Sequence, residues 1–438
     1  MNSSDAYDAL KRTAQLLRVD VFHSDPTRDR EIVAGLQDTK VRIVADRRTA
    51  ISRGGQTAIV TLFCQLEMMG IEVQLDVPDL DLVAPQPPLR AQRLAEGLLD
   101  YAEDLIPGGS SVGSQRPDLI FVMGNAKAAG AHVRLSWTDD TALVVPASQS
   151  VPSPSGNKLP FGAIAAAVAG AAEGIRAAIP VIAEHLDVAP CGDQGWRNPG
   201  TRSVKISLAH LFKGLDPKLG DVDAISGGAI MNACLYSLLR IPDLAGRLRV
   251  IEPERLDMSN LNRYALTRRS NVGDRKIDAL SGYSTNRFEI VGEDRRLDRE
   301  TVAELEPFAA KVLVGVDDIP SRWIAQEHCY DKRLIVGSTS HNFVLVSEHE
   351  IGTACAGCVH TKDDDTAGPI PTIAFVSLLA GMLQAARLLA TPSPRGLGID
   401  AWPLGLDGRR GIRAYTPTPA RPCPVGCGAS RRADRLTG

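Results

Sequence analysis

The 438-residue sequence has little of several features that mark particular classes of protein. Aromatic residues make up only 5% of the chain, and the net charge of −3 lacks the basic excess that nucleic-acid binding favours. The N-terminus has neither the apolar core nor the small-residue cleavage pattern of a secretory signal peptide. No uncharged apolar run reaches the roughly 18–20 residues that a membrane span needs. These absences predict a cytoplasmic protein that binds neither nucleic acid nor membrane.

Hydrophobic residues make up 44% of the chain and charged residues 23%, so its length predicts two domains, each with a core. The most apolar stretch, 161–180, is rich in alanine and glycine but carries Glu173 and Arg176. It is therefore predicted to be a packed helix rather than a membrane span. The eight cysteines are expected to be buried thiols or metal ligands rather than disulfides.

The first half begins with the order of elements of a doubly wound sheet. A strand, a glycine turn, a helix and a strand are predicted in succession at 41–45, 52–55, 56–69 and 71–75. This half carries no Ser-Asn-Leu sequence after its second strand, and no arginine and lysine placed to reach a triphosphate. We therefore expect a structural role for it. The expected organisation is a first domain at 1–190, a Pro/Gly-rich linker at 191–205 and a second domain at 206–438.

The second half repeats the same order of elements. A turn at Gly227-Gly228 separates a predicted strand from a helix at 229–239, and the next strand ends in Glu252. Later elements are predicted as strands at 311–316, 334–337, 342–346 and 350–353, a long helix at 371–390 and a loop-like tail after Pro392.

Two similar segments support an internal repeat. PFGAIAAAVAGAAEGIR at 160–176 resembles PTIAFVSLLAGMLQAAR at 371–387 in its Pro, Ala, Ala-Gly and Arg positions. The predicted fold class is therefore α/β, with tandem Rossmann-like domains whose mostly parallel sheets are flanked by helices. The first domain is expected to be a degenerate copy that lacks the residues of a triphosphate site. The second domain is expected to be a copy that has them.

The Gly227-Gly228 turn is a weak signal when it is taken by itself. Glycine lets backbone N–H groups approach phosphates at a helix N-terminus. Glu252 ends the following strand, where dinucleotide-binding folds place an acid against ribose hydroxyls. A nicotinamide-dependent dehydrogenase fits these features as well as an ATP-binding enzyme does.

The residues that follow favour ATP. Arg263 and Lys276 lie just beyond the acid, in the segments SNLNR and VGDRK. Hydride transfer needs no cations around a triphosphate, whereas attack on an α-phosphate does, because negative charge develops there. Asp317 ends a later strand at the same edge of the sheet, and its carboxylate oxygens suit Mg²⁺.

These segments resemble the family of ubiquitin-activating enzymes and the thiamine and molybdopterin pathway adenylyltransferases (ThiF/MoeB-like). The family pattern is a glycine-rich turn, acid-x-acid, Ser-Asn-Leu-Asn/Gln-Arg-Gln, Gly-x-x-Lys and a strand ending in Thr-Asp-Asn. The five blocks stand in this order at 227–228, 252–254, 259–263, 273–276 and 316–318. The resemblance covers about 220–430 of the sequence.

The resemblance implies a role for each matching residue. Glu252 would hold the ribose, Asn260 would help to orient the phosphates, and Asp317 would bind magnesium. The implied nucleotide-binding residues are Gly227, Gly228, Glu252, Asn260, Arg263 and Lys276. The implied catalytic residues are Arg263, Lys276 and Asp317.

The sequence departs from the family pattern without losing a charged catalytic group. Ile225 and Ile230 stand in place of the outer glycines, and Glu252 replaces the usual aspartate. Tyr264 replaces a glutamine and Asp318 an asparagine.

Four cysteines form a second constellation. Cys355 and Cys358 have the CxxC spacing, and Cys423 and Cys427 the slightly wider CxxxC spacing. Two close pairs of thiolates suit a closed tetrahedral zinc site, and similar pairs flank the last long helix in the family, where zinc is structural. Redox chemistry and plain buried thiols are the alternatives.

The sequence offers no evident nucleophile for a thioester. The loop between the first cysteine pair and the long helix, where thioester-forming relatives carry a catalytic cysteine, has none. Cys191, in the linker, is the one spare cysteine expected to be exposed. The others are predicted core thiols: Cys64, Cys234 and Cys329. Arg28 and Arg30 are candidates for an arginine that reaches the γ-phosphate, with solvated surface charge as the alternative.

The predicted function is ATP-dependent adenylation of the C-terminal glycine carboxylate of a ubiquitin-like protein, in a bacterial conjugation or sulfur-transfer pathway. ATP, Mg²⁺ and Zn²⁺ are the expected cofactors. A conjugating enzyme or a sulfur donor is the expected further partner. Two alternatives remain open at this point: adenylation of a ribosomal peptide, and a non-catalytic scaffold that binds a ubiquitin-like partner.

Overall fold

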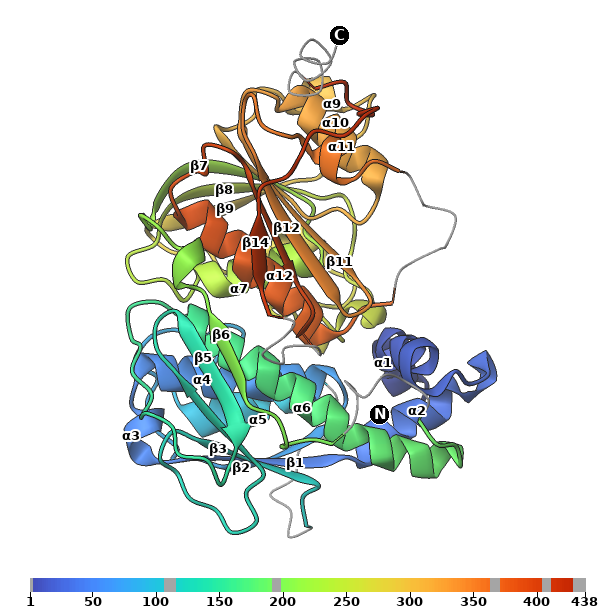
Figure 1. Cartoon of the computed structure of the whole chain (residues 1–438), viewed down its shortest axis with the longest axis vertical. Helices are drawn as coiled ribbons and strands as arrows, with labels where there is room; N and C mark the ends of the chain where they lie inside the picture. Colours follow the sequence, from blue (N-terminus) through green and yellow to red (C-terminus); the bar gives the residue numbers. More distant parts are fainter. Residues whose placement is uncertain (1–2, 106–115, 191–197, 363–370, 404–410, 428–438) are drawn as a thin grey trace.

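The computed structural model describes residues 3–105, 116–190, 198–362, 371–403 and 411–427. The chain forms two mostly parallel sheets with helices around them, as the sequence predicts (Figure 1). Cys191 lies outside the described residues.

The first sheet has six strands in the order β2-β1-β3-β4-β5-β6. Neighbours from β2 to β4 are parallel, and β5 and β6 join in antiparallel fashion. Its strands are β1 (Lys40–Ala45), β2 (Glu72–Asp76), β3 (Leu119–Met123), β4 (Val133–Trp137), β5 (Thr141–Pro146) and β6 (Val204–Ser207). Because β6 pairs with β5, the first sheet extends into the range expected to be a linker.

The helices of the first half precede and interrupt these strands. They are α1 (Ser3–Leu17), α2 (Asp29–Asp38), α3 (Arg47–Ala50), α4 (Arg53–Met68), α5 (Leu94–Leu105) and α6 (Phe161–Leu186), with a π-turn η1 (Arg18–Phe22) and a 3₁₀ turn η2 (Pro26–Arg28) after α1. α6 is long and apolar enough to cross a membrane, but 89% of its apolar window is buried in the protein. The prediction of a packed helix is confirmed.

The turn expected at 52–55 is wrong, because these residues begin α4. The Ser52 hydroxyl accepts a hydrogen bond from the Gly55 N–H at 2.9 Å and caps the helix. A side chain at Gly54 would place its Cβ 2.1 Å from the carbonyl oxygen of Gly156. Only glycine therefore fits at position 54, beneath the loop that carries Gly156.

The second sheet has eight strands in the order β14-β13-β12-β11-β10-β7-β8-β9. From β11 to β9 the neighbours are parallel, and from β11 to β14 they are antiparallel. Its strands are β7 (Lys218–Ile225), β8 (Ala245–Ile251), β9 (Phe288–Glu293), β10 (Lys311–Val314), β11 (Arg333–Ser340), β12 (Phe343–His349), β13 (Leu397–Ala401) and β14 (Arg413–Tyr415). Its helices are α7 (Ala229–Leu238), α8 (Lys276–Ser281), α9 (Val302–Leu305), α10 (Ile319–His328), α11 (Ala356–Val359) and α12 (Ala374–Leu389), with 3₁₀ turns η4 (Ala209–Leu211), η5 (Met258–Asn260) and η6 (Arg269–Asn271).

Two expectations for the second half are wrong. Residues 350–353 form a turn rather than a strand, closed by a hydrogen bond from the Thr353 N–H to the Glu350 carbonyl at 3.0 Å. The tail after Pro392 is not only a loop, because β13 pairs with β12 and β14 pairs with β13. These short strands depend on a partner strand far back in the sequence.

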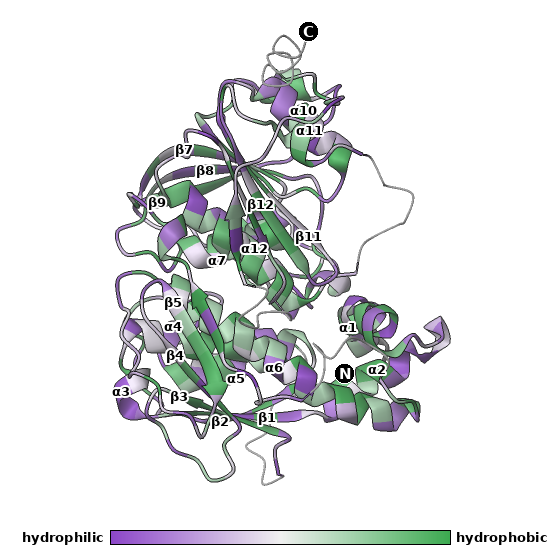
Figure 2. Ribbon diagram, in the orientation of Figure 1, coloured by the Kyte–Doolittle hydropathy of each residue, from purple (hydrophilic) through white to green (hydrophobic). Residues whose placement is uncertain are grey.

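The two halves share one hydrophobic core. Helices α4 and α6 of the first half and α7 and α12 of the second lie between the two sheets (Figure 1). Hydrophobic residues dominate β5, β11 and α12 (Figure 2). Across this boundary the Thr61 and Tyr236 hydroxyls are 2.8 Å apart, and the buried Arg268 donates to the Pro88 carbonyl at 3.1 Å. The first half therefore supports the second through direct packing.

A buried ion network fastens β12 to α12. Glu348 is fully buried and accepts hydrogen bonds from the Arg333 Nε at 3.0 Å and the Arg387 Nε at 2.9 Å. Arg387 also donates to the Leu211 carbonyl at 2.6 Å, which ties in the segment that joins the two sheets. Since all three charges are removed from water, each depends on the others.

Replacing Glu348 by glutamine is expected to destabilise the protein by about 3 kcal/mol, because two buried guanidinium groups lose their counter-charge. Urea denaturation measures the loss. The control is Glu289→Gln, since Glu289 pairs with Arg247 on the surface with 61% of its side chain exposed. That variant should unfold at nearly the wild-type urea concentration. Equal midpoints for the two variants would contradict the prediction.

Candidate functional site

A cleft of about 820 Å³ opens at the carboxyl ends of β7, β8 and β10. This is the edge at which parallel α/β sheets bind ligands. The predicted site residues that line it are Gly228, Glu252, Asn260, Arg263, Lys276 and Asp317. Gly227 lies just behind the wall, where its N–H donates to Glu252 at 2.9 Å. The structure thus brings together residues from all five segments that match the family pattern.

The turn before α7 has a constrained backbone. Ser226 has a φ of 91°, a region that L-residues rarely adopt, and its hydroxyl accepts a hydrogen bond from the Gly228 N–H at 3.0 Å. Gly228 is the N-cap of α7 and supplies no side-chain cap. The first turn of α7 therefore points uncapped N–H groups toward the cleft, a favourable arrangement for an anion.

Glu252 and Lys276 form a preorganised charged pair on the β8 side of the cleft. The Glu252 carboxylate accepts from the Glu254 N–H at 3.0 Å, in addition to Gly227. The Lys276 Nζ lies 3.7 Å from Glu252 and 2.5 Å from Glu254. Burial lowers the pKa of Lys276, but Tyr264, Glu252 and Glu254 raise it by more, so the net pKa is above its ordinary value. Lys276 is therefore a buried, permanently charged ammonium.

The Ser-Asn-Leu-Asn-Arg segment begins in η5 and continues past it to present Arg263 to the cleft. Asp257 and Asn260 cap this turn reciprocally, with the Asn260 side-chain oxygen accepting from the Asp257 N–H at 2.9 Å. The Arg263 guanidinium donates to the Ser259 carbonyl at 2.5 Å and to Asn262 at 2.7 Å. Burial lowers the pKa of Arg263, although an arginine remains charged.

Asp317 and Asp318 have different roles after β10. The Asp318 carboxylate caps α10 by accepting from the Ser321 N–H at 2.8 Å. The Asp317 carboxylate lines the cleft and accepts no hydrogen bond from any residue of the described ranges. An ionised carboxylate in this position fits a magnesium ion that also binds phosphate oxygens.

The structure adds Arg12, which sequence reasoning missed. α1 packs against η5, where the Asn262 side chain donates to the Thr13 hydroxyl at 3.1 Å, and this packing brings Arg12 into the cleft wall. Arg28 instead pairs with its neighbour Glu31, and Arg30 lies 5.2 Å from the ring of Tyr7. Neither Arg28 nor Arg30 lines the cleft, which favours their reading as surface charges. Nothing local in the sequence distinguishes Arg12.

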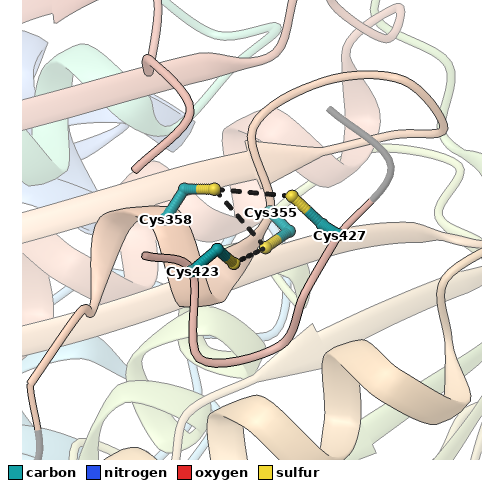
Figure 3. A group of neighbouring side chains, drawn as sticks. All are labelled: Cys355, Cys358, Cys423 and Cys427. Carbon is teal, nitrogen blue, oxygen red and sulfur yellow. Dashed lines mark hydrogen bonds between the residues drawn. The ribbon is translucent and has the colours of Figure 1, made fainter. Parts of the chain in front are cut away.

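The four predicted zinc ligands come together beside α11 (Figure 3). Their sulfur atoms all lie within 4.8 Å of one another, with Cys355 3.7 Å from Cys358 and 3.5 Å from Cys423. Cys358 and Cys427 are also 3.5 Å apart. A tetrahedral site with Zn–S bonds of about 2.3 Å requires sulfurs roughly 3.8 Å apart, so the donor set and spacing fit zinc.

Three other cysteines are core thiols, as predicted. Burial raises the pKa of Cys64 and of Cys329 to about 12, and it raises the pKa of Cys234 as well. A thiol with such a pKa is protonated at neutral pH and is a poor nucleophile. Among the described residues, the cysteines outside the four-sulfur cluster therefore offer no reactive thiolate.

The cysteine cluster is tied to the cleft through α10. The Trp323 indole N–H donates to the His360 carbonyl at 2.8 Å, and Gln326 accepts from the Ala356 N–H at 2.8 Å. On the same helix, Arg322 donates to the Val316 carbonyl at 2.9 Å, next to Asp317. α10 thus connects the segment that carries two cysteines with the loop that carries the magnesium candidate.

Comparison with known proteins supplies few relatives. No family model matches the chain. A Sinorhizobium fredii (strain NBRC 101917 / NGR234) protein called uncharacterized protein y4jF is 25% identical over 252 residues, which are 57% of this chain and 46% of the relative. The match thus spans less than half the length of that relative.

Solved structures with a similar fold include E. coli MccB with succinimide, at 14% identity and a TM-score of 0.42, covering 68% of this chain and 98% of that one. The microcin C7 biosynthetic enzyme MccB in complex with N-formylated MccA has 13% identity and a TM-score of 0.41, with the same coverage. PaaA has 15% identity and a TM-score of 0.34, covering 45% of this chain and 72% of that one. Likenesses of this size say nothing about activity, and the α/β fold stands on the two sheets themselves.

Proposed function

We propose that the second half binds ATP·Mg²⁺ and transfers its AMP moiety to a carboxylate. One observation carries this proposal: Arg263, Lys276 and Asp317 converge in a single cleft at the uncapped N-terminus of α7. A buried cation, a partly buried one and a free carboxylate provide what a nucleoside triphosphate with its magnesium needs. A nicotinamide cofactor, which is the alternative for the Gly227-Gly228 turn, would need neither the free carboxylate nor both cations.

In the proposed reaction a carboxylate oxygen attacks the α-phosphorus of ATP. A new P–O bond forms, the bond to the bridging β-phosphate oxygen breaks, and pyrophosphate leaves with that electron pair. Arg263 and Lys276 stabilise the charge that develops on the phosphate oxygens. Glu252 accepts from the ribose hydroxyls, and Asn260 helps to orient the phosphates. Asp317 would hold the magnesium, which neutralises phosphate charge when it is bound.

We propose that the substrate is the C-terminal glycine of a ubiquitin-like protein, with a ribosomal peptide as the alternative. The three described cysteines outside the cluster are buried and have raised pKa values, which favours transfer of the acyl group from the adenylate directly to an external thiol, sulfur donor or amine. A peptide substrate fits this feature equally well. A non-catalytic scaffold is disfavoured because the charged groups of the cleft are all in place.

We also propose that the first half, up to the end of β6, is a degenerate copy of the adenylation domain. The start of α4 corresponds in order to the start of α7, and in both turns the N–H groups of the glycine pair donate to side chains of the protein. The Gly54 N–H donates to Asn157 at 3.2 Å, and the Gly55 N–H donates to Ser52. The carbonyl of Gly156 presses against Gly54, where a phosphate would have to lie. In the first half, this carbonyl thus occupies the place that corresponds to the proposed phosphate position of the second half.

ATP–pyrophosphate exchange tests the proposed function. The purified protein is incubated with ATP, Mg²⁺ and labelled pyrophosphate, with either a ubiquitin-like protein ending in Gly-Gly or a set of short peptides. Exchange that requires the ubiquitin-like protein supports the main proposal, and exchange with peptides supports the alternative. If no carboxylate supports exchange although ATP binds, adenylation is ruled out in favour of a nucleotide-binding scaffold.

Arg12 is expected to contact the terminal phosphates of the bound nucleotide. Arg12→Ala should weaken ATP binding about tenfold and leave AMP binding unchanged, because a charge-assisted hydrogen bond to a phosphate is lost. Isothermal titration of ATP and AMP measures both constants. Arg30→Ala is the matched control, since Arg30 is also carried by an N-terminal helix but lies outside the cleft. Equal losses for ATP and AMP would contradict this placement of Arg12.

A further inference from the structure

Tyr264 stands where the resembling family has a glutamine, and its side chain lies in the cleft wall. Only 4% of the residue is exposed. Its ring is 5.4 Å from the Arg263 guanidinium and 5.7 Å from the Lys276 Nζ. The aromatic ring is therefore shared by the two cations of the site, an arrangement that holds both in fixed positions.

The Tyr264 hydroxyl is directed toward the N-terminus of α7. It lies 3.7 Å from the position that a Cβ would take at Gly228. The hydroxyl is thus beside the N–H groups that begin α7, at the point where an anion would bind.

The charged and backbone groups around this hydroxyl are donors, and the Ser226 hydroxyl, 3.0 Å from the same Cβ position, already accepts from the Gly228 N–H. A phenol needs an acceptor for its proton, but a guanidinium, an ammonium and a helix N-terminus can only donate. Within the described ranges, the Tyr264 hydroxyl makes no hydrogen bond. The proton is therefore left for an acceptor that enters the cleft, and the positive surroundings select an anionic one.

We propose that Tyr264 is a phosphate-binding residue. Its hydroxyl donates to the phosphate oxygen nearest Gly228, and its ring contacts both Arg263 and Lys276 and holds them in position. The residue thus takes over one polar contact at a position where the family has an amide. This inference deepens the proposed function, because the phosphate is that of the proposed ATP. It concerns recognition of the phosphate chain and not of the base or the ribose.

Tyr264→Phe tests the proposal, because it removes the hydroxyl and keeps the ring. Isothermal titration with ATP, pyrophosphate and adenosine as separate probes gives three affinities for each protein. We expect about tenfold weaker binding of ATP and of pyrophosphate, with adenosine unchanged, as one hydrogen bond to a charged group is lost. Tyr264→Gln, which restores the family's residue, should recover part of the loss.

Tyr283→Phe is the matched control, since Tyr283 is partly buried and its hydroxyl donates to the Leu266 carbonyl at 2.6 Å, outside the cleft. It should change the melting temperature and leave all three affinities alone. Unchanged ATP and pyrophosphate binding in Tyr264→Phe would overturn the role of Tyr264 while leaving the proposed function intact. A wild-type protein that binds pyrophosphate but not ATP would overturn the proposed function. The pyrophosphate affinities of Tyr264→Phe and wild type would then decide whether Tyr264 binds phosphate. Binding of neither probe would overturn both.

Discussion

Lys276→Ala is expected to lower the rate of ATP–pyrophosphate exchange by about 100-fold or more. Lys276 is 5% exposed and is the cation closest to the acids at the end of β8, with its Nζ 2.5 Å from Glu254, whereas Arg296 lies 3.8 Å from that acid and is largely exposed. Removing one preorganised group that stabilises transition-state charge in a shielded site has an effect of this size. The exchange rate at saturating substrate, with ATP affinity measured separately, separates chemistry from binding.

Lys311→Ala serves as the control for the loss of a half-buried lysine. Its Nζ donates to the Leu219 carbonyl at 2.9 Å, and it lies outside the cleft. That variant should lose some stability and keep its exchange rate. If Lys276→Ala retained wild-type exchange while remaining folded, the assignment of this cleft as the adenylation site would be wrong.

Cys358→Ser is expected to abolish stoichiometric zinc binding and to lower the melting temperature by roughly 10 °C or more. The four thiolates join α11 to a C-terminal segment more than sixty residues later. The hydrophobic cluster that surrounds them is small. The apolar cluster around the four thiolates consists of small residues, so the metal is expected to contribute much of the stability of this junction. Elemental analysis of the purified protein and differential scanning calorimetry measure the two effects.

Cys329→Ser removes a buried thiol outside the cluster and is the matched control. It should keep one equivalent of zinc, although a hydroxyl in an apolar site costs some stability. Hydrogen exchange adds a local readout: loss of zinc should deprotect α10, which is bonded to α11 through Trp323 and Gln326. A wild-type protein without zinc, or full zinc in Cys358→Ser, would contradict the proposal of a zinc site.

The amino-acid sequence alone was enough to predict the position of the cleft and its charged lining residues Glu252, Arg263, Lys276 and Asp317. Strands of alternating βα order place their carboxyl ends at one edge of a sheet, so Glu252 and Asp317 had to come near the Gly227-Gly228 turn. The cysteine cluster was equally predictable, because two close pairs of thiols have few uses other than a shared metal. In both cases short local spacings carry the information.

Only the tertiary structure decided the features that depend on contacts between distant segments. Arg12 enters the cleft because Thr13 bonds to Asn262, a residue 249 positions away. The Gly156 carbonyl, from a loop about a hundred residues later, covers Gly54 in the first turn of α4, which makes the start of α4 differ from the start of α7. The strands β13 and β14 likewise exist only through pairing with β12 and its neighbour. Such contacts are stabilised by packing and backbone pairing between distant segments. The residue periodicity within a short segment therefore cannot predict them.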